Sequence, residues 1–268
     1  MTHGRARRGS VRRLPAFAFP AVLALLILVV PLVGLIVRAP WGDLGAELAA
    51  PEVRQALVLS ITTSLWATAL AMLFGVPLAW VLARLEFRGR ALLRALIVLP
   101  MVLPPVVGGV ALLLAFGRRG LLGQWLDQAF GITLPFTTPA VVIAELFVAM
   151  PFLIIAVEAA LRSSERGYEE AAATLGAGRW LVFRRVTLPL IAPSLGAGAA
   201  LCWARALGEF GATITFAGNL PGTTQTMPLA VYLALQSRPE GAIVLSLILL
   251  AVSLGVLVLL RDRWFAAA

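Results

Sequence analysis

The chain alternates between long apolar stretches and short polar segments. A helix rises about 1.5 Å per residue, so a helix that crosses a hydrocarbon core of about 30 Å needs about 20 apolar residues. Six stretches of about this length occur, at residues 17–37, 58–83, 92–116, 139–161, 193–216 and 241–260. The pattern therefore predicts an all-α, polytopic membrane protein with six transmembrane helices. Pro100, Pro104 and Pro105 are expected to bend the third of them.

The arginines between these stretches predict an orientation. Sixteen of the 22 arginines lie in the leader, in the segments 84–94 and 162–189 and in the tail from residue 261, whereas five lie in the alternate loops. Positive residues favour the cytoplasmic side, so both termini are expected there. The first apolar run is longer than the core of a signal peptide, which favours a retained anchor. We expect a basic cytoplasmic leader at 1–16 and a single transmembrane domain at 17–268.

The composition excludes several classes of catalyst. Sixty per cent of the residues are hydrophobic and 13% are charged, whereas about 25% are charged in a soluble domain. The absence of lysine excludes a Walker A site, and the single histidine, His3, leaves no suitable base for a Ser or Cys triad. Because Cys202 is the one cysteine, a zinc site of clustered Cys and His is excluded as well. We therefore expect a protein that is not an enzyme and that binds no metal or cofactor itself.

The segment at 162–189 is unusually long for a connection between membrane helices. It reads RSSERGYEEAAATLGAGRWLVFRRVTLP. Acidic residues near its start favour a helix N-terminus, and Gly176 and Gly178 can end that helix and turn the chain. The pattern predicts a short helix, a glycine turn and a second helix on the cytoplasmic face. An amphipathic helix that lies on the lipid surface is the alternative.

The spacing within this segment resembles the EAA signature of ABC importer permeases, E-A-A-x3-G-x9-I-x-L-P. The matching residues are Glu170, Ala171, Ala172, Gly176, Val186, Leu188 and Pro189, with Val186 in place of isoleucine. The resemblance implies the fold of a type I ABC importer permease. It also implies that the short helix docks into a cleft of a separate cytoplasmic ATPase, and that this partner holds the ATP and Mg²⁺.

Arg205 and Glu209 are the most informative charged residues within an apolar stretch. An ionisable group in a membrane is costly and usually faces the bundle interior or an aqueous path. Because the two residues are four apart, they share one helix face. Either they form a buried structural ion pair, or the arginine lines the route of an anion. In the second interpretation Gly208 and Gly211 allow close approach of another helix, and Thr213 adds a hydroxyl group.

Two further carboxylates lie in the fourth apolar stretch. Glu158 is near its inner end and is expected to be solvated or to cap a helix. Glu145 lies deeper in the stretch and is left without a predicted role.

Several stretches resemble the permeases of molybdate ABC importers. They cover residues 99–108, 117–120, 205–212, 216–219, 221–222, 224–226 and 228–230. Sulfate permeases share the ALGEFG and AGN elements, whereas the Thr-Gln-Thr segment at 224–226 and the Pro-Pro pair at 104–105 point toward molybdate.

The resemblance implies a function and a set of partners. The function is inward transport of molybdate, with tungstate as a further candidate substrate, across a bacterial cytoplasmic (inner) membrane. The implied partners are a second copy of the chain in a homodimer, ABC ATPase subunits and an extracytoplasmic molybdate-binding protein. A permease for sulfate or another oxyanion is the first alternative. An ion-coupled carrier or a polytopic membrane enzyme is a remote one, since neither explains the EAA segment.

Overall fold

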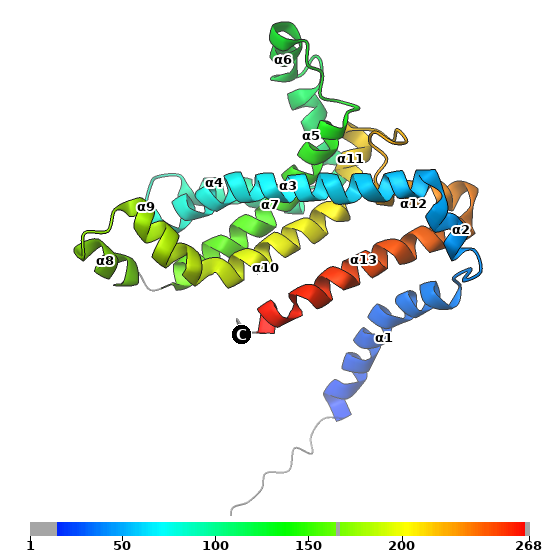
Figure 1. Cartoon of the computed structure of the whole chain (residues 1–268), viewed down its shortest axis with the longest axis horizontal. Helices are drawn as coiled ribbons and strands as arrows, with labels where there is room; N and C mark the ends of the chain where they lie inside the picture. Colours follow the sequence, from blue (N-terminus) through cyan, green and yellow to red (C-terminus); the bar gives the residue numbers. More distant parts are fainter. Residues whose placement is uncertain (1–14, 165–166, 266–268) are drawn as a thin grey trace, which may run out of the picture.

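The computed structural model describes residues 15–164 and 167–265, and every regular element within them is a helix (Figure 1). In chain order these are α1 (Pro15–Val37), α2 (Leu44–Ala49), α3 (Pro51–Arg84), α4 (Arg90–Val102), α5 (Pro105–Phe116), α6 (Gly123–Phe130), α7 (Thr138–Ser163), α8 (Gly167–Thr174), α9 (Arg179–Val182), the π-helix η1 (Phe183–Thr187), α10 (Leu188–Leu207), α11 (Gly211–Phe216), α12 (Met227–Ser237) and α13 (Pro239–Phe265). The all-α prediction is confirmed. The predicted basic leader lies almost wholly outside the described residues.

Helices α3, α7 and α10 form the centre of the fold and run side by side along its long axis (Figure 1). Their shared core contains apolar side chains from all three helices, including Leu82, Leu153, Ile154, Val157, Ile191 and Cys202. The EAA segment, residues 167–189, lies at one end of this bundle, and α2 and α12 lie at the other. The bundle therefore connects two distant faces of the molecule.

Small residues allow these helices to approach closely. On α3 they recur at every fourth position and are all buried: Ala67, Ala71, Gly75, Ala79 and Ala83. A Cβ atom on Gly75 would lie 3.2 Å from Ile154 Cγ1, and one on Gly198 of α10 would lie 2.9 Å from Ala156 Cβ. Helices in lipid attract each other mainly through such close van der Waals contact. α7 is thus packed between α3 and α10 with little room for an added methyl group.

The third predicted crossing, at 92–116, is sharply bent. The chain bends by 117° between α4 and α5, at Leu103 and Pro104. Each of these two residues precedes a proline, which restricts it to an extended conformation; their ψ angles are 136° and 131°. The expected proline bend is confirmed, and it is so sharp that α4 and α5 do not form one continuous helix. Helices α5 and α6 instead project from the bundle as an arm (Figure 1).

The fifth predicted crossing, at 193–216, is also interrupted. One continuous helix runs from Arg179 to Leu207, and after a break the short α11 begins at Gly211. α11 packs on α5 through glycines on both sides. A Cβ on Gly211 would lie 2.6 Å from Pro105 Cβ, and one on Gly109 would lie 2.5 Å from Thr215 Cβ. The break therefore redirects the chain from the bundle onto the arm.

Six complete crossings are not confirmed. Four described helices are long and apolar enough to cross a membrane, and the α4–α5 pair makes five if it counts as one crossing. The four are Ala18–Val37, Pro51–Arg84, Thr138–Ser163 and Arg179–Leu207. In α13, the apolar part Pro239–Gly255 is shorter than these.

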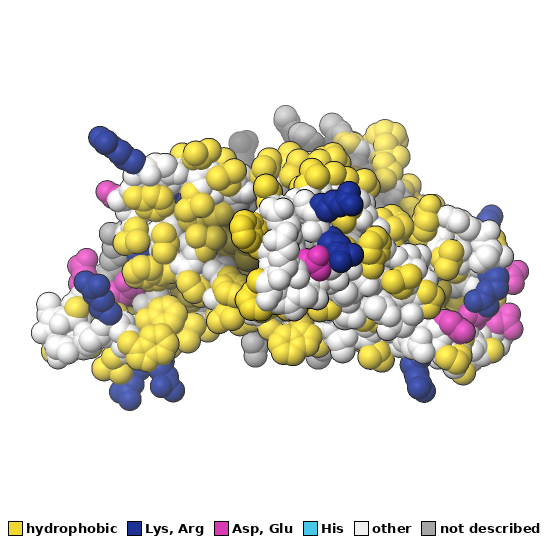
Figure 2. Space-filling view, turned by 90° about the horizontal axis from the view of Figure 1, so that it is seen from above, with side chains coloured by type: hydrophobic (Ala, Val, Ile, Leu, Met, Phe, Trp, Pro, Cys, Tyr) yellow, Lys and Arg dark blue, Asp and Glu magenta, His cyan; other side chains and the backbone are white. Residues whose placement is uncertain are grey.

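The surface of the protein suits a lipid environment. Hydrophobic side chains cover much of the face in Figure 2, and charged side chains gather toward its two ends and on the arm at its centre. On the arm, Arg118 Nε donates a hydrogen bond to Asp127 Oδ2 at 2.9 Å, which raises the pKa of the arginine. Helix α1 lies at the edge of the fold, and its apolar residues are exposed almost throughout. Such an apolar exterior is typical of a membrane-embedded chain.

We expect Gly198→Leu to lower the melting temperature (Tm) of the detergent-solubilised protein. The added side chain has no space beside Ala156, and overpacking costs about 1–3 kcal/mol. Gly34→Leu on α1 is the matched control, because nothing lies within 4 Å of a Cβ at that position. Thermal unfolding in the same detergent compares the two variants. Equal Tm values for them would contradict the packing of α10 on α7.

Candidate functional site

The EAA segment, residues 167–189, folds as a helix, a turn and a second helix. α8 carries Glu169 and Glu170 in its first turn, where negative charge favours a helix N-terminus. It ends at Thr174, and Gly176, in the turn that follows, has a φ of +84°, in the left-handed region. The Gly176 N–H donates to the Ala173 carbonyl at 3.0 Å, and the Ala177 N–H donates to the Ala172 carbonyl at 3.1 Å. This pair of bonds is the Schellman motif, which favours glycine at Gly176. The predicted helix and turn are confirmed.

The second helix of the segment begins directly after the glycine turn, as predicted, and it runs on into the fifth predicted crossing. Gly178 precedes it in an extended conformation, and the helix continues from Arg179 through η1 into α10 without a break. Pro189 therefore does not open a new membrane segment but lies within this helix. A proline cannot donate the regular backbone bond, and the π-helical register ends just before it, at Thr187. The loop predicted at 162–189 is consequently shorter, and Val186 and Leu188 are helical as well.

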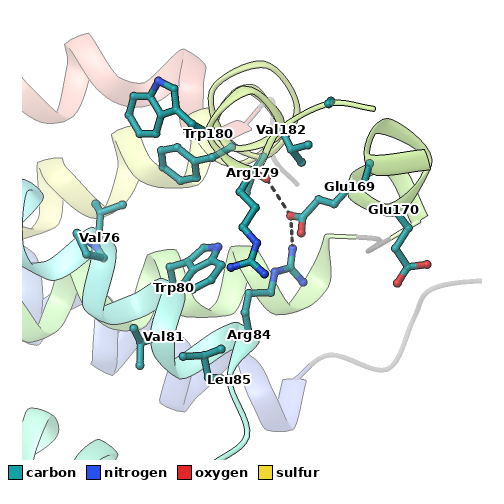
Figure 3. A pocket seen from close by; sticks show the side chains of 15 residues that line it. Val76, Trp80, Val81, Arg84, Leu85, Glu169, Glu170, Arg179, Trp180 and Val182 are labelled. Atoms are coloured by element: carbon teal, nitrogen blue, oxygen red, sulfur yellow. Dashed lines mark hydrogen bonds and ion pairs between the residues drawn. The ribbon is translucent and has the colours of Figure 1, made fainter. Parts of the chain in front are cut away.

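A single carboxylate ties the EAA segment to the bundle. Arg84 Nη2, at the end of α3, donates to Glu169 Oε1 at 2.6 Å, and Thr187 Oγ1 donates to the same oxygen at 2.9 Å. Arg84 Nη2 also donates to Ser164 Oγ at 3.0 Å. The side chains of Arg84 and Thr187 are almost completely buried. Three elements, α3, α8 and η1, are thus fixed to one another at this point (Figure 3).

Sequence reasoning missed this group, which we call the Glu169 latch. It consists of Arg84, Glu169 and Thr187. The signals were an arginine as the last residue of a long apolar helix and an acidic residue directly before the EAA motif. The residues are 85 and 18 positions apart along the chain, so their contact could not be deduced from spacing.

Several side chains of the EAA segment are exposed and free to contact another molecule. Leu175 and Trp180 are 88% and 72% exposed, and Glu170 and Ala171 are exposed as well. Trp180 stacks on Phe183 with 5.8 Å between ring centroids, which fixes its position. Exposed large apolar side chains on an ordered element are typical of an interaction site.

Near the end of α7, the environment of Glu158 differs from the one predicted. The residue is buried, and its carboxylate pairs with Arg94 of α4 and, at 3.0 Å, with Arg162 on the next turn of α7. The expectation of a solvated or capping charge is therefore wrong. Glu158 instead holds α4 against α7, with the burial of its charge offset by two arginines.

The second candidate region is the break between α10 and α11. The predicted pair is present, with Arg205 Nη2 2.7 Å from Glu209 Oε2. The Ala212 N–H donates to Glu209 Oε1 at 2.9 Å, so this side chain also caps the start of α11. Glu209 is 1% exposed, whereas Arg205 reaches the surface. The carboxylate thus stabilises the break and partly neutralises the arginine.

The other residues predicted for a translocation path are dispersed around this break. Gly208 is exposed, and no other helix of the described chain lies within 4 Å of a Cβ there. Gly211 does make a close approach, against α5. Thr213 is completely buried, and its hydroxyl has no hydrogen-bond partner in the described part of the chain. Arg205 and Gly208 are the members of the set that reach the surface.

A further buried carboxylate lies on α7. Glu145 is 1% exposed, and Thr63 Oγ1 of α3 donates to its Oε1 at 2.9 Å. Nearby on α3, Ser60 Oγ accepts a hydrogen bond of 2.7 Å from the Met227 N–H at the start of α12. These two bonds, which sequence reasoning did not assign, fix α3 to α7 and to α12.

The Thr-Gln-Thr stretch at 224–226 forms the buried end of the connection between α11 and α12. All three residues are buried, and Thr224 Oγ1 accepts from the Leu220 N–H at 2.9 Å. No cluster of three or more His, Cys, Asp or Glu side chains that could hold a metal ion occurs among the described residues.

Comparison with known proteins identifies the family. Residues 75–268 match the family described as binding-protein-dependent transport system inner membrane component. The molybdenum transport system permease protein ModB of Mycobacterium tuberculosis is 48% identical over 241 residues, which cover 90% of this chain and 91% of ModB. The sulfate transport system permease protein CysT of Escherichia coli is 37% identical, with 90% of each chain covered.

The fold is also similar to that of a solved transporter. A chain of a bacterial ABC transporter involved in the import of the acidic polysaccharide alginate aligns with a TM-score of 0.73 at 20% identity, and the alignment covers 93% of both chains. The chain therefore belongs to the family of binding-protein-dependent transport system inner membrane components.

Proposed function

We propose that this chain is the permease subunit of an ABC importer that carries molybdate inward across a bacterial inner membrane. The observation that carries the proposal is the EAA segment, which is folded as an exposed helix and turn and is fixed to the bundle by the Glu169 latch. A membrane enzyme or an ion-coupled carrier has no use for such an element. The substrate is inferred from the relatives, since ModB, a molybdenum permease, is more similar than the sulfate permease CysT.

The structure supports a mechanical role for the EAA segment. After the glycine turn, α8 is followed by one continuous helix of 29 residues, Arg179–Leu207, which includes α10. This helix is about 43 Å long at 1.5 Å per residue. The same α8 is held to α3 by the Glu169 latch. A displacement of α8 by a partner ATPase is therefore passed to both helices, as in a rigid-body transition.

The break between α10 and α11 is the proposed site of substrate passage. The helix that starts at the EAA segment ends there, and Arg205 supplies a positive charge at the surface. Its pairing with Glu209 weakens that charge, so an oxyanion would be attracted without being held tightly. A path through the membrane must be enclosed by protein on all sides, and we propose that two copies of the chain enclose this path together.

The remaining partners and the orientation follow from the same reasoning. ATP and Mg²⁺ would bind to a separate ATPase, since this chain has no lysine for a nucleotide site. A binding protein on the outer side would deliver the substrate. The excess of arginine places the EAA segment and both termini in the cytoplasm, with α1, α3, α4–α5, α7, α10 and α13 as the six crossings.

We expect this chain to restore uptake of labelled molybdate in cells that lack their own transporter, when it is expressed with its ATPase and binding protein. Excess tungstate should reduce the uptake and excess sulfate should not. Loss of uptake without the ATPase is also expected, because the chain cannot hydrolyse ATP. Inhibition mainly by sulfate would reassign the substrate, whereas uptake that continues without the ATPase would contradict the whole proposal.

We expect Gly176→Val to abolish co-purification with the ATPase while the chain still inserts into the membrane. The positive φ angle at Gly176 strains any other residue by about 1–2 kcal/mol, which disturbs the turn after α8. Gly178→Val is the matched control, because Gly178 has an ordinary φ angle of −66° and nothing within 4 Å. If the Gly176 variant retained the ATPase as well as the control does, the turn would have no part in docking.

We expect Arg84→Gln and Glu169→Gln each to slow uptake and to lower the Tm. Each change removes the ion pair and leaves a partner without its counter-charge. The double variant should be no worse than the poorer single variant, since residues in contact are non-additive. Uptake rates and Tm values of the four proteins form the double-mutant cycle. Additive effects would show that the latch does not act as a unit.

A further inference from the structure

A pocket lies between the end of α3 and the EAA segment, beside the Glu169 latch that joins them (Figure 3). Its volume is about 800 Å³. Apolar side chains from both elements form much of its wall: Val76, Trp80 and Val81 from α3, and Trp180, Val182 and Phe183 from the EAA segment. A site for a small hydrophilic ion does not need such walls, because an ion gains nothing from apolar contact.

Two arginines enter this apolar pocket. Arg84 extends from α3 and Arg179 from the start of α9, so their guanidinium groups approach from opposite sides (Figure 3). The side chain of Arg84 is only 8% exposed, and its Nε–H has no acceptor in the described part of the chain. No described carboxylate lies within ion-pair distance of Arg179. Two cations therefore face the pocket.

Two arginines and two glutamates line the pocket, so the formal charges balance, but Arg179 has no acidic partner. Glu169 is engaged by Arg84 in the latch and neutralises one of the two arginines. Glu170 also lies at the edge of the pocket, but its side chain points away from Arg179 (Figure 3). Arg179 is therefore left without a counter-charge beside it. The pocket is thus complementary to an anionic group attached to an apolar body.

The pocket continues the lipid-facing surface of α3. Trp66, Leu73 and Trp80 are spaced seven residues apart and are all exposed, so they form one apolar face along the helix. Trp80 ends this face and forms part of the pocket wall. Tryptophan is enriched at the level of lipid head groups, and arginine at this depth contacts them. The pocket therefore opens where an acyl chain against α3 would meet its head group.

From this geometry we infer that the pocket binds an anionic phospholipid from the leaflet next to the EAA segment. Its phosphate accepts hydrogen bonds from the guanidinium group of Arg179, and an acyl chain lies along Val76 and Trp80. The lipid lies between α3 and the EAA segment, beside the Glu169 latch. It would fill the space across which α8 transmits force. The inference does not depend on the substrate or on the ATPase.

The test uses the purified full-length chain in detergent, titrated with phosphatidylglycerol or phosphatidylcholine. Native mass spectrometry counts the lipids that stay bound. We expect a preference for phosphatidylglycerol, and Arg179→Gln should weaken its binding about fivefold, the effect of one arginine near a charged lipid surface. Ala173→Phe, which fills the pocket from α8, should weaken the binding of both lipids.

Arg185→Gln is the matched control. It removes the same charge from the same element, but Arg185 is exposed and does not line the pocket, so binding should be unchanged. Equal losses in Arg179→Gln and Arg185→Gln would mean unspecific attraction and would overturn the proposal, as would a wild-type chain without lipid preference. Displacement by inorganic phosphate would assign the pocket to a free anion. A cross-link from Leu85→Cys, in a Cys202→Ser background, to a second copy or to the ATPase would assign it to a protein interface.

Discussion

The close packing of α3 and α10 on α7 is the constraint on which the rest of the structure depends. Lipid tails are as apolar as the helices, so the hydrophobic effect does not drive helices together in a membrane. They gain stability mainly through close van der Waals packing. The small residues from Ala67 to Ala83 and Gly198 make this approach possible. Polar bonds then fix the helices along their length. The Glu169 latch does so at one end of α3, and the Ser60–Met227 bond does so nearer the other.

Each buried carboxylate that the structure describes lies where two elements meet. Glu158 joins α4 to α7, Glu145 accepts from Thr63 across the α3–α7 contact, and Glu209 stabilises the break between α10 and α11. A buried charge without a partner costs more than its contacts return, so these carboxylates hold the helices only in the arrangement that supplies their partners. They specify the geometry of the bundle rather than adding much stability to it.

Local patterns in the sequence predicted the helices, the proline bend and the EAA turn, because these features depend on neighbouring residues. The Arg205–Glu209 pair was predictable for the same reason, since four residues separate its members on one helix. The long-range partners were not. Glu158 and Arg94 are 64 positions apart, and whether a carboxylate near a helix end is solvated depends on the helix packed against it. The interruption after Leu207 likewise reflects how α11 packs on α5.

The positions of the two interruptions, after Leu207 and within 92–116, suggest where the molecule can move. One apolar cluster joins α3, α7 and α10, and a second joins α5, α7 and α11. Apart from the shared α7, the chain passes from the first group to the second at Gly208–Phe210, and α4 joins the second at Leu103–Pro104. Both connections are short and lie outside regular helix; Gly208 allows backbone angles to change at the first, whereas the prolines restrict them at the second. A force applied at the EAA segment would therefore move α3 and α10 as a unit and change the angle of α5 and α11, next to Arg205.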